Sequence, residues 1–366
     1  MEFSVNRDGF KNVLGVMIKA VSPIATDPRL SGVLITAKGK GLVLKTTNLD
    51  LYIEANVAGD IKQAGEILLP ARLLFSIFEI LPGDVVSFQG GEKSCKVISD
   101  QAEYDLRKIE FDEWFNIPEI KNADEFKLPI ASFGNLAKKV CCATSKDDTR
   151  PVLQGINIRS EKDKVSLTAF DGYRIACATS NSEILADKKR ETVVMGPLLV
   201  NLADLSKFGE EATFRVGENL IGINCAGFNI VFSRLAGQFP ETSKFINSDM
   251  PINIKVNTDE LLKSVQRISL LSSDFPIVSV NINPKTNMLH LHGNAESIGK
   301  CDDDVACECN VKTAVTISFN CKYLLEGLAA IESENTIIKL KQGDAPAVFS
   351  EIVPEAYSYV LMPVKL

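Results

Sequence analysis

The feature that most restricts the fold of this 366-residue chain is a pattern that occurs three times. Residues 3–21, 126–144 and 254–271 each contain a short strand with alternating apolar residues, a polar or turn residue, and an amphipathic helix. The apolar helix positions are Phe10, Val13, Leu14 and Met17, then Phe133, Leu136 and Val140, then Leu261, Leu262, Val265 and Ile268. Their helical spacing predicts one buried stripe per helix, and therefore one core per repeat.

A second helix-forming segment also occurs three times, at residues 67–83, 193–209 and 317–333. A proline or a capping side chain lies near the start of each helix, at Pro70, Pro197 and Asn320. Alternating runs separate the helices at residues 41–46, 95–98, 165–169, 221–224, 289–292 and 347–350. These runs predict antiparallel strands with one solvated face.

The repeats start at residues 3, 126 and 254, and one third of the chain is 122 residues. The sequence therefore predicts an α+β protein of three similar domains, at residues 1–122, 123–250 and 251–366. Each domain would place two helices on one face of its antiparallel sheets. Three joined copies would form a curved body with a helical face and a sheet face, which suggests a ring or an arc.

The charge balance limits the contact that the protein could make with nucleic acid. Lys and Arg number 40 against 47 Asp and Glu, which gives a net charge of −7. Such a surface disfavours coating of nucleic acid by the whole protein, but it allows a local basic stripe. The charged N-terminus lacks a signal-peptide pattern, and the apolar stretch 67–81 is too short to span a bilayer. Nine scattered cysteines fit a reduced, cytoplasmic setting. Because the sequence shows neither a signal-peptide pattern nor a bilayer span, we also expect no membrane association.

Histidine is nearly absent, which limits catalytic chemistry. The chain has two histidines, His290 and His292, so most general-base, triad and zinc schemes would depend on one short segment. These histidines, Cys301, Asp304 and the pair Cys307 and Cys309 form the most enzyme-like group, but their spacing matches no familiar metal motif. We expect no metal, no cofactor and no catalysis; a metal site here is the alternative interpretation.

Several segments carry a more specific signal. They are Thr26–Gly32, Thr47–Leu51, Thr149–Gly155, Leu167–Ala176 with its Asp171-Gly172-Tyr173-Arg174 core, Gly237–Glu241, Arg267–Leu271, Phe319–Leu325 and Tyr359–Leu366. Together, and in this order, they resemble the bacterial sliding clamps, the beta subunits of DNA polymerase III. The resemblance runs from residue 1 to residue 366.

The resemblance implies the DNA clamp fold, with antiparallel sheets outside and two helices per domain inside, closed into a head-to-tail dimeric ring. Such a ring encircles double-stranded DNA without reading its sequence and slides on it as a processivity factor. It tethers the replicative polymerase, and also binds the clamp loader and other proteins with a clamp-binding motif. Because the ring holds DNA by enclosure, each phosphate contact can stay weak enough to exchange during sliding.

Basic residues on the expected helices would then face DNA. They are Lys11, Lys19, Arg72, Lys138, Lys139, Lys207, Lys263, Arg267 and Lys322, with Arg150 added from the loop after the third helix. The alternative interpretation for each one is an ordinary solvated helix face.

The family binds partner peptides in an apolar cleft between its second and third domains. The matching positions here are Leu153, Phe170, Gly172, Ile175, Pro240, Phe245, Val360 and Met362, with Tyr173, Asn320, Tyr323, Pro346, Pro363 and Val364 in a neighbouring subsite and Arg150, Arg174 and Lys244 at the edges. Plain core burial competes with this role, although the apolar chain end favours a docked tail. Phe170 and Phe245 replace smaller residues that are common in the family, so the preferred peptide stays open.

The resemblance also implies an interface between the first domain of one chain and the third domain of the other. The matching positions are Ile77, Leu81, Tyr104 and Leu106 on one side and Leu270 and Leu271 on the other. Core burial competes at Leu270 and Leu271 because both continue a helical stripe. A three-domain protein-interaction scaffold that does not encircle DNA is the alternative function.

Overall fold

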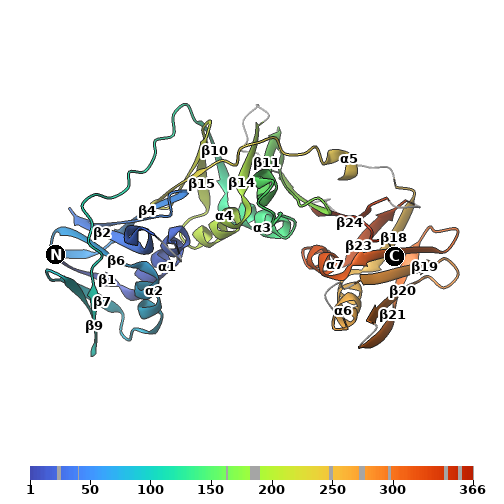
Figure 1. Cartoon of the computed structure of the whole chain (residues 1–366), viewed down its shortest axis with the longest axis horizontal. Coiled ribbons are helices and arrows are strands. Elements are labelled where there is room, and N and C mark those ends of the chain that lie inside the picture. The colour runs from blue at the N-terminus through green and yellow to red at the C-terminus, as the bar shows by residue number, and fades with distance from the viewer. Residues whose placement is uncertain are drawn as a thin grey trace. The chain divides into compact units, whose positions relative to one another are not determined.

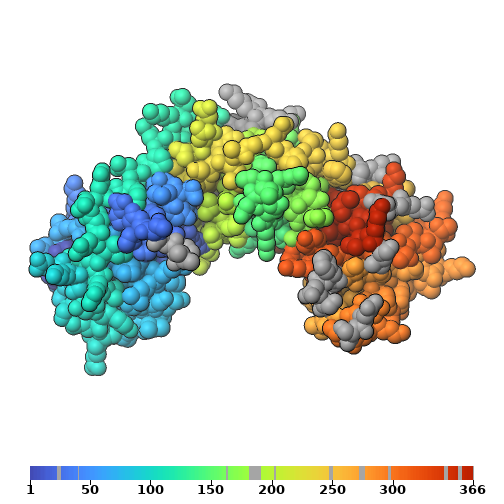
Figure 2. Space-filling view, in the orientation of Figure 1, coloured from blue at the N-terminus to red at the C-terminus, as the bar shows by residue number. Residues whose placement is uncertain are grey.

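The computed structural model describes residues 1–22, 26–39, 41–161, 164–181, 190–246, 250–271, 277–295, 298–341, 345–352 and 357–365. The chain forms two compact units, which are coloured along the sequence in Figures 1 and 2. Unit 1 contains Met1–Ala131 and Asn201–Arg234, and unit 2 contains Ser132–Val200 and Leu235–Leu366. Each unit therefore contains one terminal third of the chain and part of the middle third.

The described residues contain the six helices that the sequence predicts, together with one short helix that it does not. They are α1 (Arg7–Met17), α2 (Ala71–Ile80), α3 (Ile130–Cys141), α4 (Gly196–Leu202), α6 (Thr258–Ser269) and α7 (Cys321–Leu328), with α5 (Ser243–Ile246) as the addition. Asparagine side chains cap three of them: Asn6, Asn257 and Asn320 accept hydrogen bonds from the main chain of α1, α6 and α7. These caps stabilise one strand-to-helix switch in the first repeat and two in the third.

Unit 1 contains two antiparallel sheets. The strands β1 (Glu2–Asn6), β5 (Asp60–Gln63), β7 (Val85–Gly90), β8 (Ser94–Ser99) and β9 (Ala102–Arg107) form the order β5-β1-β7-β8-β9. The strands β2 (Gly32–Lys38), β3 (Gly41–Thr47), β4 (Leu51–Ala58), β6 (Gly65–Pro70), β10 (Asp124–Pro129), β15 (Glu211–Val216), β16 (Leu220–Cys225) and β17 (Phe228–Ser233) form the order β10-β15-β16-β17-β4-β3-β2-β6.

Unit 2 is built on one antiparallel sheet of twelve strands, in the order β14-β11-β12-β13-β25-β24-β23-β18-β21-β20-β19-β22. Its strands are β11 (Gly155–Glu161), β12 (Lys164–Phe170), β13 (Arg174–Asn181), β14 (Arg190–Met195), β18 (Ile252–Asn257), β19 (Ile277–Asn283), β20 (Met288–Ala295), β21 (Gly299–Cys309), β22 (Val315–Asn320), β23 (Asn335–Leu340), β24 (Ala347–Glu351) and β25 (Tyr357–Leu361). The six alternating runs in the sequence all form strands, as expected.

Two strand pairings join successive repeats with the same register. In unit 1, β17 pairs with β4, and Phe232 lies opposite Leu51. In unit 2, β25 pairs with β13, and Leu361 lies opposite Arg174. Leu51 and Arg174 are the first residues of their strands. Each unit therefore contains one junction of the same construction. The predicted domain boundaries at residues 122 and 250 fall outside the helices and strands and stay a prediction.

The predicted apolar stripes are buried, except that Leu136 and Leu262 are only partly buried. In unit 1, Phe10 of α1 packs against Phe78 of α2 with ring centroids 5.0 Å apart, and Phe88 of β7 joins them. The prediction of one solvated face is wrong for β24, all of whose residues are buried. Phe349 on one side of this strand packs against Phe319, while Val348 on the other side belongs to an apolar cluster. No helix in the described part of the chain is long and apolar enough to cross a membrane.

Gly327 of α7 allows the closest helix-to-sheet contact in unit 2. A Cβ atom at this position would lie 2.3 Å from the ring of Tyr359, whose side chain is fully buried in β25. By contrast, a Cβ atom at Gly15 of α1 would make an ordinary contact of 3.4 Å with Phe75. The two glycines lie in helices, but only Gly327 is required by packing.

We therefore expect Gly327→Ala to lower the free energy of unfolding, because overpacking costs about 1–3 kcal/mol or more and exceeds the gain in helix propensity of about 1 kcal/mol. Gly15→Ala, the matched control, should leave stability unchanged or raise it by up to about 1 kcal/mol. Urea denaturation followed by circular dichroism measures both effects. Equal stability changes in the two variants would contradict this account of Gly327.

Candidate functional site

An apolar cluster at the β13–β25 junction of unit 2 contains part of the predicted cleft. Ile175 of β13, Val348 of β24, Val360 of β25 and Met250 form its buried part. Phe170 of β12 and Ile246 of α5 pack against it and are only partly buried. The structure thus brings Phe170, Ile175 and Val360 together, as the sequence predicts.

Sequence reasoning missed Val348, Met250 and Ile246. Val348 lies in a run whose alternation was apparent, but alternation alone does not show which face of β24 meets β25. Val348 lies opposite Val360 in the pairing of these two strands, so the strand order places it in the cluster. Ile246 belongs to the unpredicted four-residue helix α5, which contacts β25.

The apolar tail of the chain is docked on unit 2. The main-chain N–H of Met362 donates to the carbonyl of Tyr173 at 2.9 Å, and that of Val364 donates to the carbonyl of Ser318 at 2.8 Å. Three of the predicted cleft side chains stay at the surface: Tyr173 is 64% exposed, Phe245 45% and Met362 41%. These side chains are available to a partner, whereas Val360 and Ile175 are covered by their neighbours.

Arg174 is buried and organises the floor of this region. Its guanidinium pairs with Asp171 at 2.9 Å and with Glu326 of α7, and it donates to the carbonyl of Cys142. It also lies 4.0 Å from the centre of the Tyr323 ring. Burial opposes the charged form of Arg174, but Tyr359 and the two carboxylates outweigh it and raise the pKa of Arg174. Arg174 therefore joins β13 to α7, and its predicted role at the edge of the cleft stays a prediction.

The hydroxyl of Tyr359 completes this network. It accepts a hydrogen bond from Arg174 at 3.3 Å and donates one to the carbonyl of Tyr323 at 2.8 Å. Burial raises the pKa of Tyr359, so the phenol stays protonated and can act as the donor.

The other predicted cleft residues have distinct places. Leu153 is buried in the 3₁₀ turn Pro151–Gln154, and Asn320 caps α7 through the N–H of Tyr323 at 3.2 Å. Gly172 has φ = +99°, which favours glycine at this turn. Gly172, Pro240, Lys244 and Arg150 are exposed, while Tyr323, Pro346, Pro363 and Val364 are half-buried.

The predicted DNA-facing residues divide into two groups. Arg72, Lys138, Arg150, Lys207, Lys263 and Lys322 are exposed and make no ion pair with another described residue. Lys19 bonds to Asp204 and to the carbonyl of Asn201, and Lys139 lies 3.0 Å from Glu332 and 3.3 Å from Glu351. Lys11 and Arg267 pair with Asp8 and Asp303. Lys19 and Lys139 are mostly buried, so their charges already serve the fold.

The predicted interface residues also divide. Leu270 is 83% exposed and Leu271 is half-buried, so core burial does not hold for Leu270. Ile77 of α2 and Leu81, the residue that ends this helix, are 4% and 3% exposed within a single chain, so core packing accounts for them and their interface role stays a prediction. Leu73 and Ile80, four residues before and three residues after Ile77, lie beside it on α2 and are 51% and 73% exposed. Tyr104 is half-buried and Leu106 is buried in the edge strand β9.

The histidines form a polar cluster with β21. His290 lies 2.9 Å from Asp304, and His292 lies 2.7 Å from Asp302. The hydrogen bond from His292 holds the pKa of Asp302 below its ordinary value. No group of three or more His, Cys, Asp or Glu residues within the described ranges could hold a metal ion.

Burial raises the pKa of Cys95, Cys142, Cys307 and Cys321 to about 11, which fits thiols that pack as small apolar groups.

Edge-joined repeats with an apolar cleft at a junction define the class of sliding clamps. Family models for the N-terminal, central and C-terminal domains of the DNA polymerase III beta subunit match residues 1–118, 127–241 and 244–365. The chain belongs to this family.

Individual relatives agree with this assignment along the whole chain. The beta sliding clamp of Bacillus subtilis (strain 168) is 27% identical over 376 aligned positions, which cover 100% of both chains. A crystal structure of the Bacillus subtilis DNA polymerase sliding clamp matches with a TM-score of 0.90 and 25% identity, covering 100% of this chain and 99% of that one. The beta subunit from Thermotoga maritima has the same fold, with a TM-score of 0.93 at 19% identity and the same coverage.

The Arg174 network leads to a prediction about stability. We expect Arg174→Lys to lower the free energy of unfolding by about 2–4 kcal/mol, since one ammonium group cannot replace hydrogen bonds to Asp171, Glu326 and the Cys142 carbonyl. Arg150→Lys, at an exposed position, should change it by less than about 0.5 kcal/mol. Chemical denaturation of the two variants compares them. An Arg174→Lys variant as stable as the parent would show that the network contributes little.

Proposed function

We propose that two copies of this chain form a head-to-tail ring that encircles double-stranded DNA, slides on it and tethers DNA polymerase III and other partners. The ring acts in the cytoplasm as a processivity factor and catalyses no reaction itself. Family membership supports this function, and the repeat geometry supplies the specific argument for ring closure.

The observation that carries the proposal is a third junction that lacks its partner strand. By position in its hairpin, β9 corresponds to β17 and β25: Ser99 pairs with Ala102 as Cys225 pairs with Phe228. Similarly, β21 corresponds to β4, because Met288 pairs with Ala306 as Gly41 pairs with Ala58. Within the described residues, β9 pairs only with β8, and residues 299–305 of β21 pair only with β20.

The exposure of the corresponding side chains agrees with a missing partner. At the two complete junctions, Ile53 and Ile230 are each 3% exposed, and Ala176 and Tyr359 are fully buried. The corresponding residues at the two free edges, Tyr104 and Cys301, are only partly buried. Pairing β9 of one chain with β21 of another would bury both. It would also remove two open sheet edges, and two such contacts close a ring of two chains.

The exposed cations on the helices are the candidates for DNA contact. Lys138, Lys263 and Lys322 project from α3, α6 and α7, and none forms an ion pair with a described residue. Unpaired lysines suit transient, sequence-independent contacts with phosphates.

The cleft of unit 2 would hold partner peptides, with Tyr173, Phe245 and Met362 as exposed anchors. A scaffold that does not encircle DNA would not be retained on circular DNA, and the following experiment tests this difference.

The register of the two complete junctions, β17–β4 and β25–β13, suggests a cross-linking test of the ring. Transferred to the third junction, it places Tyr104 of one chain opposite Cys301 of the other. Directly opposed antiparallel residues have Cα atoms about 4.5–5.5 Å apart, within disulfide range. We therefore expect Tyr104→Cys to form an intersubunit disulfide with Cys301 on oxidation. After assembly around nicked circular DNA, the closed ring should stay with the circle in detergent and leave once the circle is cut.

The matched control is Tyr104→Cys combined with Cys301→Ser, which removes the predicted partner thiol and should give no covalent ring. Non-reducing electrophoresis measures the cross-link, and co-migration with DNA measures encirclement. Failure to cross-link would reject the β9–β21 register, whereas a cross-linked dimer released from intact circles by detergent would reject encirclement.

The cleft leads to a separate prediction. Met362→Asp places a charge on the exposed wall of the cleft and should weaken binding of a polymerase-derived clamp-binding peptide at least tenfold, because desolvating the charge opposes burial of the apolar anchors. Leu49→Asp, at a position that is 49% exposed in unit 1, is the control and should bind normally. Fluorescence polarisation of labelled peptide measures both. Equal affinities would place the peptide elsewhere.

A further inference from the structure

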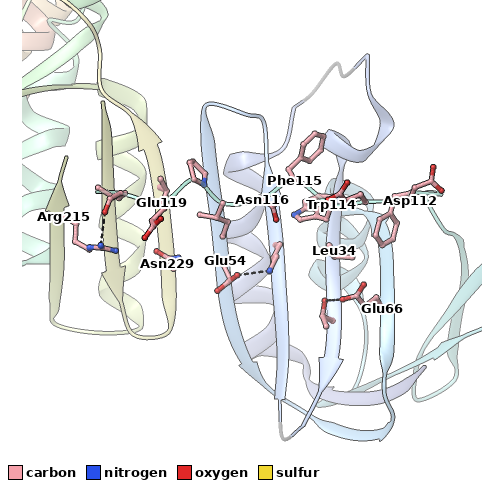
Figure 3. A pocket seen from close by; sticks show the side chains of 18 residues that line it. Leu34, Glu54, Glu66, Asp112, Trp114, Phe115, Asn116, Glu119, Arg215 and Asn229 are labelled. Carbon is pink, nitrogen blue, oxygen red and sulfur yellow. Dashed lines mark hydrogen bonds and ion pairs between the residues drawn. The ribbon is translucent and has the colours of Figure 1, made fainter. Parts of the chain in front are cut away.

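Unit 1 contains a pocket that is separate from the predicted cleft of unit 2. The chain between β9 and β10, residues 108–123, has no helix or strand and runs over the outer face of the eight-stranded sheet; we refer to it as the strap. Strap residues 111–120 and side chains from the sheet enclose about 610 Å³ (Figure 3). This volume lies within the range of ligand-binding pockets in proteins.

The strap is held at both ends and in the middle. At one end, the N–H of Ile109 donates to the carbonyl of Leu68 at 2.9 Å. At the other end, Ile120 is buried, and a Cβ atom on Gly222 would lie 2.6 Å from its terminal methyl group. In the middle, Arg29 donates to the carbonyl of Glu113 at 2.7 Å and lies 4.3 Å from the centre of the Phe115 ring. The pocket is therefore a built feature between two fixed surfaces.

The pocket occupies the position in unit 1 that the cleft occupies in unit 2. Val231 of β17 lines the pocket, and Val360 of β25 lines the cleft. These valines correspond, because Val231 lies opposite Tyr52 and Val360 opposite Ile175, each in the second pair of its junction. The pocket of unit 1 therefore lies over the face of its junction that corresponds to the face with the apolar cluster in unit 2.

The pocket is elongated. Its lining runs from Glu66 on β6 to Arg215 on β15, and these strands stand six places apart in the sheet. Since neighbouring strands lie about 4.8 Å apart, the lining spans roughly 29 Å. An extended chain covers about 3.3–3.6 Å per residue, so about eight or nine residues would fill this length. The shape fits an extended peptide segment better than a small compact ion.

The charge of the lining selects a basic occupant. Five carboxylates line the pocket, against two cations, Lys45 and Arg215. Both cations are already engaged, Lys45 with Glu54 at 3.2 Å and Arg215 with Glu125 at 3.1 Å. The remaining carboxylates are Glu66, Asp112, Glu113 and Glu119, and no ion pair between described residues involves them, although Glu66 accepts a hydrogen bond from Thr36 at 3.0 Å. Phe111, Trp114 and Ile117 of the strap are half-buried and supply apolar surface beside these charges.

The main chain of the strap offers further contacts. Within the described residues, no main-chain N–H from residue 110 to residue 119 donates to another main-chain carbonyl. An extended segment beside the strap could pair with these groups, as peptides do when they add to a sheet edge.

We propose that the strap pocket is a second docking site, which binds an extended segment of a partner protein that alternates lysine or arginine with apolar residues. The segment lies between the strap and the sheet, its cations meet the four carboxylates that form no ion pair, and its apolar side chains contact Phe111, Trp114 and Ile117. This site is separate from the cleft of unit 2 and does not depend on ring closure.

Trp114 is the only tryptophan in the sequence, so its fluorescence reports on this pocket alone. The probe is a synthetic octapeptide of alternating lysine and leucine, titrated into the full-length chain. We expect a saturable change in Trp114 emission that weakens with salt, and no such change with an octapeptide of glutamate and leucine. Met362→Asp, which alters only the cleft, should leave the titration unchanged.

The decisive variant is Glu66→Gln combined with Glu119→Gln, which should weaken binding at least fivefold while the melting temperature stays unchanged. Glu79→Gln combined with Glu92→Gln removes two exposed charges of unit 1 outside the pocket and should bind like the parent. Calorimetry on the Met362→Asp background provides a second measurement of affinity. Undetectable binding by both methods, or equal affinity in the two double variants, would overturn the proposal. Spermidine binding as tightly as the peptide would overturn the peptide assignment in favour of a small cation.

Discussion

Main-chain pairing between strands of successive repeats is the interaction on which the rest of this structure depends. The β17–β4 and β13–β25 ladders use N–H and C=O groups that every non-proline residue supplies, so they require almost nothing of the side chains. This explains how the fold can match the Bacillus subtilis clamp with a TM-score of 0.90 while only 25% of the residues are identical. It also explains why the third junction has no partner strand in a single chain, because its strands, β9 and β21, belong to the first and third repeats.

Because the ladders fix the backbone, the side chains on each junction are free to differ. In unit 2 the outer face carries Ile175, Val348 and Val360, and the buried Arg174 holds α7 against the strands. In unit 1 the corresponding face carries Glu54 and Asn229, and the strap covers it. Similar backbones thus present an apolar cleft in one unit and an acidic pocket in the other.

Much of the fold could be predicted from sequence because its signals are local. Helix stripes such as Phe10, Val13 and Leu14, and caps such as Asn257 and Asn320, depend on neighbours within a few residues. The short helix α5 and the strap carry no periodic pattern, so nothing in the sequence marked them. Val348 illustrates the intermediate case, because its strand was predictable but its neighbouring strand was not.

The burial of the candidate site residues could not be predicted, and the reason is the same at each site. A charged or apolar side chain has the same appearance in the sequence whether it faces solvent or a partner within its own fold. Arg174 resembles a ligand-facing cation until Asp171 and Glu326 are placed beside it, and Ile77 resembles an interface residue until α2 is turned toward Phe10. Both assignments needed contacts between residues that lie far apart in the chain.

The distribution of cations bears on how the proposed ring would stay on DNA. Lys19 and Lys139 are held in partly buried ion pairs, and moving Lys139 to a phosphate would leave Glu351, which is 7% exposed, without its lysine partner. The cations free to meet phosphates are therefore fewer than the sequence suggests. Since affinity for DNA rises with the number of phosphates neutralised, this smaller set favours weak and rapidly exchanging contacts. Retention must then come from closure of the β9–β21 junction, and the same weakness that prevents tight binding allows the ring to slide.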